Sequence, residues 1–123
     1  MARTDQAFGF KDEKIHEAAV YAFESLLKAQ GSNGGFPQGY EGPSTPLPVV
    51  KADYPESWPR THPPKHEYWV FYTTNDNLFP DLVPVLLEAA RIYGQDRYRQ
   101  AALAAGDFLI LAQMPDPQPA WAQ

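Results

Sequence analysis

Two copies of one short pattern constrain the fold of this chain more than any other feature. Residues 26–30 (LLKAQ) are followed by GGFPQ at residues 34–38, and residues 109–113 (LILAQ) are followed by AWAQ at residues 120–123. Each copy consists of a helix end in Ala-Gln, a turn rich in Gly or Pro, and an aromatic residue two positions before a glutamine. Two such units with one helix between them predict the alternating inner and outer helices of an α/α toroid, whose loops at one end line a cleft.

Apolar residues at three- and four-residue spacing predict three helices, and therefore an all-α fold class. We expect the first helix to be capped by Asp12 and ended by Gly31. We expect the third helix to be capped by Asp96 and to run to Gln113. Only the dipeptide Gly-Gln separates it from the second helix, which forces these two helices into an antiparallel hairpin.

The second helix has two candidate starting points. Asp76 or Asn77 would cap a long version of it, with Pro80 in the first turn, where proline is tolerated. Pro84 does not suit the interior of a long helix, so a kink, or a shorter helix capped by Asp81, is the alternative.

A long segment, residues 31–74, separates the first two helices. It holds eight of the 13 prolines and two of the three tryptophans. Structureless loops of this length are uncommon in compact domains, and disordered linkers are poor in aromatic residues. We therefore expect residues 31–74 to form an ordered aromatic and proline-rich loop over one end of the helices. Its last part, YWVFYTT at residues 68–74, has the composition of a strand and is expected to pair with a nearby extended segment.

The acidic balance of the chain, a net charge of −5, limits its partners. No basic patch of the kind that nucleic-acid-binding proteins carry is visible, so we expect no nucleic-acid partner. An acidic substrate would need local arginines or a bridging cation. The absence of cysteine excludes disulfides and thiolate metal sites. The longest apolar runs are too short to span a bilayer, so we expect no membrane partner.

Three segments carry a family resemblance. They are SLLKAQGSNGGFPQGY at residues 25–40, TTNDNLFPDLVPVLLEA at residues 73–89 and GDFLILAQMPDPQPAWAQ at residues 106–123. In this order they resemble the pectate lyases of polysaccharide lyase family 10, which carry a helix followed by Q-x-N-G-G-[WF]-P-Q, then F-N-D-[DN], then a later Q…W-x-Q unit. The chain departs from that pattern at Phe36, where Trp is commoner, and at YTTNDN, which stands in place of FNDD.

The resemblance covers residues 18–123 and implies a fold and an activity. It implies that residues 1–123 form a single domain, a partial α/α toroid that is a fragment of a larger catalytic domain. The implied activity is calcium-assisted β-elimination of polygalacturonate, in which Ca²⁺ offsets the uronate charge while a base removes the neighbouring proton. The family's base is an arginine that aligns beyond residue 123, so we expect this chain to be inactive alone.

The resemblance and the repeat also nominate site residues. The residues expected to bind substrate are Phe36, Gln38, Tyr40, Asn75, Asp76, Asn77, Trp121 and Gln123. Asp76 is the expected Ca²⁺ ligand. For the three consecutive polar residues the alternative is simple capping of a helix. For the aromatic residues the alternative to stacking on sugar rings is burial in a core, and for the glutamines it is a shared structural role.

Other interpretations stay open. The four-residue spacing of His62 and His66 suits a helical zinc site, but two intervening prolines favour a solvated loop. The chain could be a non-catalytic module that binds an acidic polysaccharide or another partner. It could also belong to the terpene-cyclase type of α/α barrel, although the acidic Asp-rich motif expected there is missing.

Two expectations concern the chain as a whole. Part of a toroid leaves helix faces uncovered, so we expect self-association or marginal stability. The resemblance implies a secreted or periplasmic protein. The first residues, however, lack the apolar region of a signal peptide, which leaves a cytoplasmic protein or prior removal of a signal as the options.

Overall fold

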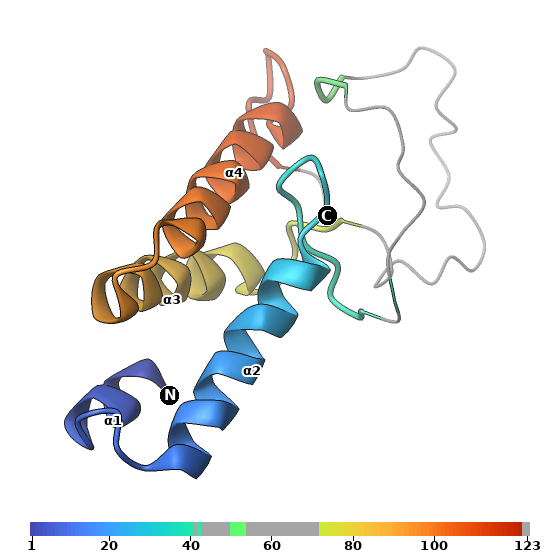
Figure 1. Cartoon of the computed structure of the whole chain (residues 1–123). Coiled ribbons are helices and arrows are strands. Elements are labelled where there is room, and N and C mark those ends of the chain that lie inside the picture. Colours follow the sequence, from blue (N-terminus) through green and yellow to red (C-terminus); the bar gives the residue numbers. More distant parts are fainter. Residues whose placement is uncertain (41, 43–49, 54–71, 122–123) are drawn as a thin grey trace.

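The computed structural model describes residues 1–40, 42, 50–53 and 72–121. Within these residues the chain forms four helices and no named strand: α1 (Ala2–Ala7), α2 (Glu13–Ala29), α3 (Leu78–Tyr93) and α4 (Asp96–Ala112) (Figure 1). The all-α class is therefore confirmed for the part of the chain that the structure describes. None of the helices there is long and apolar enough to cross a membrane.

Helix α2 begins and ends where the sequence predicts. Asp12 is its N-cap, and the carboxylate Oδ1 accepts a hydrogen bond from the Ile15 amide at 3.2 Å. This bond satisfies one of the amides that the first turn leaves without a helical partner. At the other end Gln30 is the C-cap, with extended backbone dihedral angles. One face of the helix, which includes Ala19 and Phe23, is buried.

Helices α3 and α4 form the predicted antiparallel hairpin, joined at Gly94, whose φ of 65° is left-handed. Helix α3 has 16 residues and continues through Pro84, so the shorter version starting near Asp81 is wrong. Pro80 and Pro84 are both exposed. Because proline has no amide hydrogen, the carbonyl of Pro80 lacks its usual helical donor, and the exposed face lets water compensate.

The predicted cap of α4 is also wrong. Asp96 is the first residue of the helix, and the N-cap is Gln95, which makes no side-chain capping bond. The Asp96 carboxylate instead accepts hydrogen bonds from Arg99 Nε at 2.7 Å and Gln100 Nε2 at 3.0 Å. These bonds, led by the one from Gln100, hold the pKa of Asp96 below its usual value.

The two copies of the sequence pattern have the same local structure. Helices α2 and α4 both have 17 residues, and their C-caps Gln30 and Gln113 have φ, ψ of −69°, 126° and −67°, 125°. Each of the two helices follows a shorter helix and a left-handed glycine, Gly9 or Gly94. The described part of the chain thus contains two helix pairs, α1–α2 and α3–α4, each joined through a left-handed glycine. Helix α1, which carries no apolar periodicity of useful length, was not predicted from the sequence.

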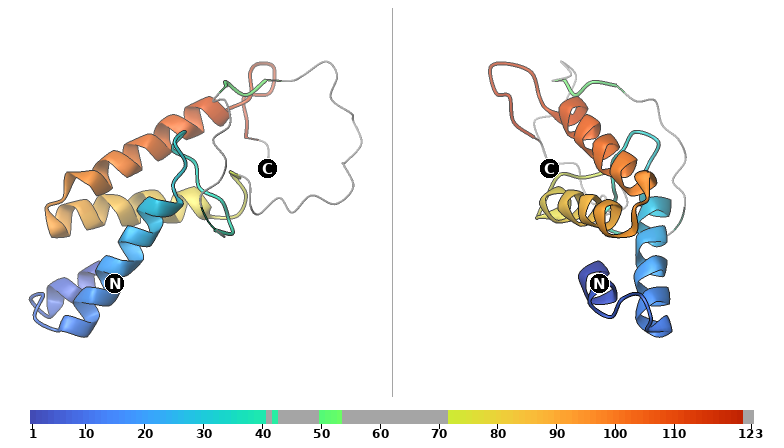
Figure 2. Two further views of the ribbon diagram at one scale, coloured as in Figure 1. Left: turned by 45° about the vertical axis from the view of Figure 1, so that its right-hand side comes forward. Right: turned by 60° about the vertical axis from the view of Figure 1, so that its left-hand side comes forward.

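The helices pack around an aromatic core. Helix α3 lies along α4, while α1 contacts both α2 and α3 (Figure 2). The Phe79 and Phe108 rings are stacked at 5.3 Å between centroids, and Phe36 meets Phe79 edge-on at 6.3 Å. Tyr98, which is 1% exposed, packs against Phe23 of α2. The core therefore joins both hairpins and the turn that follows α2.

A wholly buried carboxylate ties α1 to its neighbours. Asp5 Oδ2 accepts a hydrogen bond from the Tyr93 hydroxyl of α3 at 2.8 Å and lies 2.8 Å from His16 Nδ1 of α2. Phe10 covers the group, since its ring packs against both His16 and Tyr93. Burial and the bond to Asp5 raise the pKa of the Tyr93 hydroxyl well above its ordinary value. Three helices thus share the Oδ2 atom of one buried carboxylate, while Asp5 Oδ1 has no hydrogen-bond partner among the described residues.

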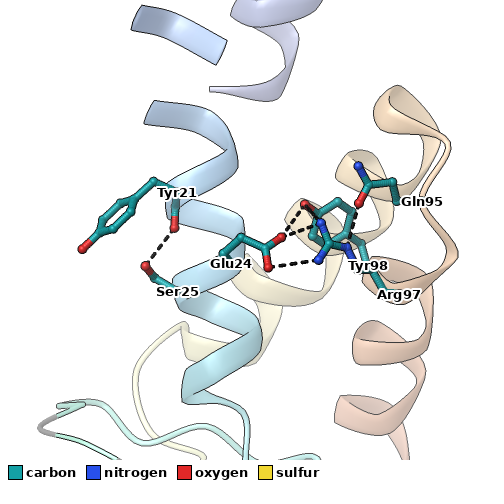
Figure 3. Close-up of polar contacts among 6 residues, drawn as sticks. All are labelled: Tyr21, Glu24, Ser25, Gln95, Arg97 and Tyr98. Atoms are coloured by element: carbon teal, nitrogen blue, oxygen red, sulfur yellow. Dashed lines mark hydrogen bonds and ion pairs between the residues drawn. The ribbon is translucent and has the colours of Figure 1, made fainter. Parts of the chain in front are cut away.

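A second polar group joins α2 to α4 (Figure 3). Arg97 Nη1 donates a hydrogen bond to Glu24 Oε2 at 3.0 Å, and Arg97 Nη2 lies 2.6 Å from Glu24 Oε1, so the ion pair is bidentate. The Tyr98 hydroxyl donates to Glu24 Oε1 at 3.2 Å, and Arg97 Nε donates to Gln95 Oε1 at 2.7 Å. A two-pronged arginine contact fixes orientation as well as distance, so it sets how α4 sits beside α2.

The Gly-Gly turn after α2 lies directly on α4. Gln30 Nε2 donates to the Gly34 carbonyl at 3.0 Å and to the Ala101 carbonyl of α4 at 2.8 Å. A Cβ atom on Gly34 would lie 2.0 Å from the Ala104 carbonyl oxygen, and the φ of Gly34 is +85°. Both the contact distance and the backbone conformation exclude a side chain at this position.

Gly34→Ala should destabilise the fold by about 2–4 kcal/mol, because the new methyl group would push the turn away from α4 and force a strained φ. Chemical denaturation followed by circular dichroism measures this change. Gly106→Ala is the matched control, since nothing lies within 4 Å of its Cβ position in the middle of α4. The control should stabilise by about 0.5–1 kcal/mol. Equal effects of the two variants would contradict the close contact.

Tyr93→Phe should lower stability by about 1–2 kcal/mol near neutral pH, because buried Asp5 loses a donor. It should also flatten the loss of stability at high pH. The raised native pKa means that the stabilisation is complete below the unfolded value of about 10 and is lost as the pH rises further. Urea titrations at several alkaline pH values test this. Tyr21→Phe, at a 75% exposed position of α2, is the control and should match the wild type.

Candidate functional site

The loops gather at one end of the helices. In Figure 1 and in the left view of Figure 2, the C-terminal ends of α2 and α4 and the N-terminal end of α3 lie toward the loop side of the helices, with residues 31–40, 72–77 and 113–121 beside them. Two isolated antiparallel bridges hold these loops, one between Pro37 and Tyr72 and one between Gln113 and Trp121. The first bridge agrees with the pairing expected for residues 68–74, of which 68–71 lie outside the described residues.

Three of the predicted site residues meet at this end. Gln38 Nε2 donates a hydrogen bond to Asp76 Oδ2 at 2.5 Å, and Asn75 Nδ2 approaches the same oxygen at 3.4 Å. Gln38 comes from the turn after α2 and the other two come from the segment before α3, so the Pro37–Tyr72 bridge brings them together. We call Gln38, Asn75 and Asp76 the amide–carboxylate cluster.

Two buried oxygen atoms, one in the amide–carboxylate cluster and one beside it, have no hydrogen-bond partner among the described residues. Asn75 Oδ1 is buried and accepts no hydrogen bond from the residues that the structure describes, and the same holds for Thr73 Oγ1 two positions earlier. Asp76 itself is exposed, and its φ is 54°, which is uncommon for a residue with a side chain. Buried acceptors without donors raise the free energy of the folded state and can mark functional sites, although a third such atom, Asp5 Oδ1, lies away from the cluster.

The capping alternative is not supported by the geometry. Asn77 occupies the N-cap position of α3, yet its side chain makes no capping bond, and the Asp76 carboxylate is engaged by Gln38. The Asn77 carbonyl accepts the Asp81 amide at 3.0 Å, as any residue at that position would. The carboxylate is therefore turned toward the loops and not toward the helix.

The aromatic candidates separate into two groups. Phe36 is 1% exposed and lies in the core, so its ring has no free face for a sugar, and we leave it out of the site. Tyr40 is 46% exposed and Trp121 is 48% exposed. Trp121 Nε1 donates to the Leu109 carbonyl at 2.8 Å, which holds the indole at the end of α4. Gln123 lies outside the described residues.

The repeated glutamines mainly do structural work. Gln30 bonds the Gly34 and Ala101 carbonyls, and Gln113 Nε2 approaches the Pro119 carbonyl at 3.4 Å. Both side chains thus bridge a helix end to the loop that follows it. Of the other repeated pair, Gln38 positions the Asp76 carboxylate, and Gln123 lies outside the described residues.

One residue at this end was missed by the sequence analysis. Lys51 Nζ donates to the Ile110 and Gln113 carbonyls, and the neighbouring Ala52 amide donates to the Leu111 carbonyl at 2.8 Å. A cation at a helix C-terminus satisfies carbonyls that have no helical donor and complements the helix dipole. Nothing near Lys51 in the sequence signals this role, because the partner is about 60 positions away.

Within the described ranges, the arginines are paired on the helices and no group of metal ligands forms. Every arginine within the described ranges pairs with a helical carboxylate: Arg3 and Arg91 with Glu88, Arg97 with Glu24, and Arg99 with Asp96. No group of three or more His, Asp or Glu side chains that could hold a metal ion forms within those ranges. Arg60, His62 and His66 lie outside them.

Comparison of the chain with protein-family models, with curated proteins and with solved structures gave no match.

Asn77→Ala should change stability by less than about 0.5 kcal/mol, because the side chain makes no capping bond. Asp12→Ala should cost about 1 kcal/mol and reduce helicity, because it removes a formed cap. Urea denaturation and far-ultraviolet circular dichroism of the two variants provide the comparison. A loss for Asn77→Ala as large as that for Asp12→Ala would restore the capping interpretation of this segment.

Proposed function

We propose that the chain is the sugar-binding part of a pectate lyase-like α/α toroid and that it binds polygalacturonate through the amide–carboxylate cluster. The observation that carries the proposal is the contact of Gln38 with Asp76 beside Asn75. These residues were nominated from two separate motifs, and capping does not account for their side chains. Amides and carboxylates at the end of a helical scaffold suit the hydroxyls and carboxylates of a uronic acid polymer.

Calcium fits the donor atoms of the cluster. Ca²⁺ takes oxygen ligands from carboxylates, amide carbonyls and water. Asp76 Oδ1 and Asn75 Oδ1 accept no hydrogen bond from the described residues, while Gln38 holds the other Asp76 oxygen. Two protein oxygens are too few for a calcium site built from protein alone, so uronate carboxylates and water would supply the other ligands. In the elimination reaction such an ion offsets the charge that develops beside the uronate carboxylate.

The residues of this chain would bind and orient the polymer. Gln38 positions the Asp76 carboxylate, and the exposed faces of Tyr40 and Trp121 suit stacking against sugar rings. The removal of the C5 proton needs a base within hydrogen-bond reach. The described arginines, Arg3, Arg91, Arg97 and Arg99, are all engaged by carboxylates on the helices, so none of these four is placed to act as that base.

The same observation favours a second candidate, a non-catalytic polysaccharide-binding module. It would use the same cluster and would not require a base. The two candidates differ in what the protein does with the bound polymer, and not in which residues bind it.

Oligogalacturonate should bind at least about tenfold more tightly with Ca²⁺ than with a chelator present, because the ion bridges two negative charges. Asp76→Asn should remove this difference, since Asn retains the tolerance for a left-handed backbone but carries no charge. Isothermal titration calorimetry measures both affinities. Asp81→Asn, in the first turn of α3, is the matched control and should bind as the wild type does.

Each outcome of this titration decides a different part of the proposal. Equal affinity with and without Ca²⁺ would contradict the calcium site, and no binding in either condition would contradict the polysaccharide proposal. The ultraviolet absorbance of an unsaturated product should not rise in the same samples. A rise would show that a base lies in this chain, and Arg60 would be the first residue to replace.

A further inference from the structure

The ammonium group of Lys51 is held in place at the loop end of α4. Residues 50–53 lie beside the C-terminal end of α4 in Figure 1 and in both views of Figure 2. Lys51 Nζ donates hydrogen bonds to the Ile110 and Gln113 carbonyls, both at 2.5 Å. The conformational entropy that a lysine side chain loses when a ligand fixes it is therefore already lost in the free protein.

One donor of this ammonium group remains for a ligand. An ammonium carries three N–H donors, and the two carbonyls of α4 use two of them. Lys51 is exposed and forms no ion pair with a carboxylate of the described residues. The third N–H can therefore donate to an acceptor that arrives from solvent, and an anionic acceptor gives the strongest hydrogen bond.

The charges around Lys51 require that such an anion touches the ammonium directly. The end of a helix carries about half an elementary negative charge, which one whole positive charge exceeds. Asp53, Asp107 and Asp116 are exposed residues near this end of the chain or of α4, and none forms an ion pair with Lys51 among the described residues. Because these three carboxylates offset the ammonium at a distance, direct contact and not long-range attraction would hold the anion.

Trp121 lies against the same end of α4. Its Nε1 donates to the Leu109 carbonyl at 2.8 Å, one residue before the Ile110 carbonyl that Lys51 binds. Trp121 also forms the antiparallel bridge with Gln113, whose carbonyl is the second acceptor of Lys51. Trp121 is 48% exposed, so much of an indole with a fixed edge remains open to a ligand. The helix end thus holds an aromatic ring and a cation together.

We propose that Lys51 and Trp121 form a second uronate subsite, in which Lys51 Nζ binds the carboxylate of a sugar whose ring stacks on Trp121. This inference rests on the proposed function, because the same polymer would occupy the amide–carboxylate cluster. The two places differ in how they hold the uronate. The cluster would hold it through Ca²⁺, whereas Lys51 contacts it directly and needs no metal ion. Esterification of the carboxylate removes the anion that Lys51 binds and keeps the ring that stacks on Trp121.

Isothermal titration calorimetry with oligogalacturonate and with its methyl ester, both in excess Ca²⁺, tests the subsite. Lys51→Met should bind the free acid about fivefold more weakly, because an ion pair is lost, and should bind the ester as the wild type does. Lys51→Arg should match the wild type for both ligands, because the guanidinium keeps the charge and has donors for the carbonyls and the carboxylate. Trp121→Ala should weaken binding of both ligands roughly tenfold, because stacking needs no charge on the sugar.

Lys14→Met is the matched control, and it should bind both ligands as the wild type does. It removes the same charge at the end of α2 that lies away from the loops (Figure 1). Circular dichroism of every variant verifies that the helices are intact. A loss for Lys14→Met as large as that for Lys51→Met would show that only the net charge matters, and would overturn the subsite.

The two ligands separate a binding role of Lys51 from a structural one. Loss for the free acid alone, with recovery in Lys51→Arg, supports the subsite. Equal weakening for acid and ester in Lys51→Met would show that Lys51 only caps α4, and overturns it, as does unchanged binding of the acid. If the ester binds too weakly to measure, the free acid decides: weakening in Lys51→Met with wild-type affinity in Lys51→Arg supports the subsite, and any other result overturns it.

The same titrations separate failure of this inference from failure of the proposed function. Wild-type binding that depends on Ca²⁺ and on Asp76, but not on Lys51, overturns the subsite alone. Binding that persists with a chelator and weakens in Lys51→Met supports the subsite, whatever the result for calcium at the cluster. No binding of either ligand by the wild type overturns both the subsite and the polysaccharide proposal.

Discussion

The close approach of the Gly34-Gly35 turn to α4 is the constraint on which the rest of the structure depends. A Cβ atom at Gly34 would lie 2.0 Å from the Ala104 carbonyl oxygen, so the turn rests on the helix backbone itself. That contact lets Gln30 reach the Ala101 carbonyl and places Phe36 in the core against Phe79. Because Phe36 is fixed, the residues after it run beside the segment before α3, and Gln38 meets Asp76. The candidate site is thus a direct consequence of two glycines and one glutamine at a helix end.

Polar groups, and not apolar burial alone, determine the order of the helices. Asp5 lies near the N-terminal end of α2 and the C-terminal end of α3, where it accepts a hydrogen bond from Tyr93 and contacts His16 Nδ1. Glu24 accepts hydrogen bonds from Arg97 and Tyr98 further along α2. Apolar surfaces can slide past each other at small cost, whereas a buried carboxylate loses most of its stabilisation when a donor moves away. The hydrogen bonds of Asp5 and Glu24 therefore fix how far each helix is shifted along its neighbour. The apolar surfaces, which are rich in alanine, specify that position less sharply.

The exposed faces of α2 and α4 follow from the same repetition that builds the fold. A helix that repeats a neighbour carries that neighbour's contact residues at equivalent positions, whether or not a partner is present. Ile110 on α4 is 66% exposed, whereas its equivalent on α2, Leu27, packs against the core.

The sequence by itself determined the helices with strong periodicity, the cap at Asp12, the hairpin at Gly94 and the repeat that ends at Gln30 and Gln113. These features depend on residues within a few positions of one another, so local patterns reveal them. The sequence also nominated the polar residues of the candidate site, but it could not decide between a cap and a site for Asp76. Only the tertiary structure decided that Phe36 is buried while Tyr40 is exposed, that Lys51 binds the end of α4, and that six residues of α1 deliver Asp5 to His16 and Tyr93. Each of these joins segments far apart in the chain, and contacts of that kind arise from packing, which no local pattern encodes.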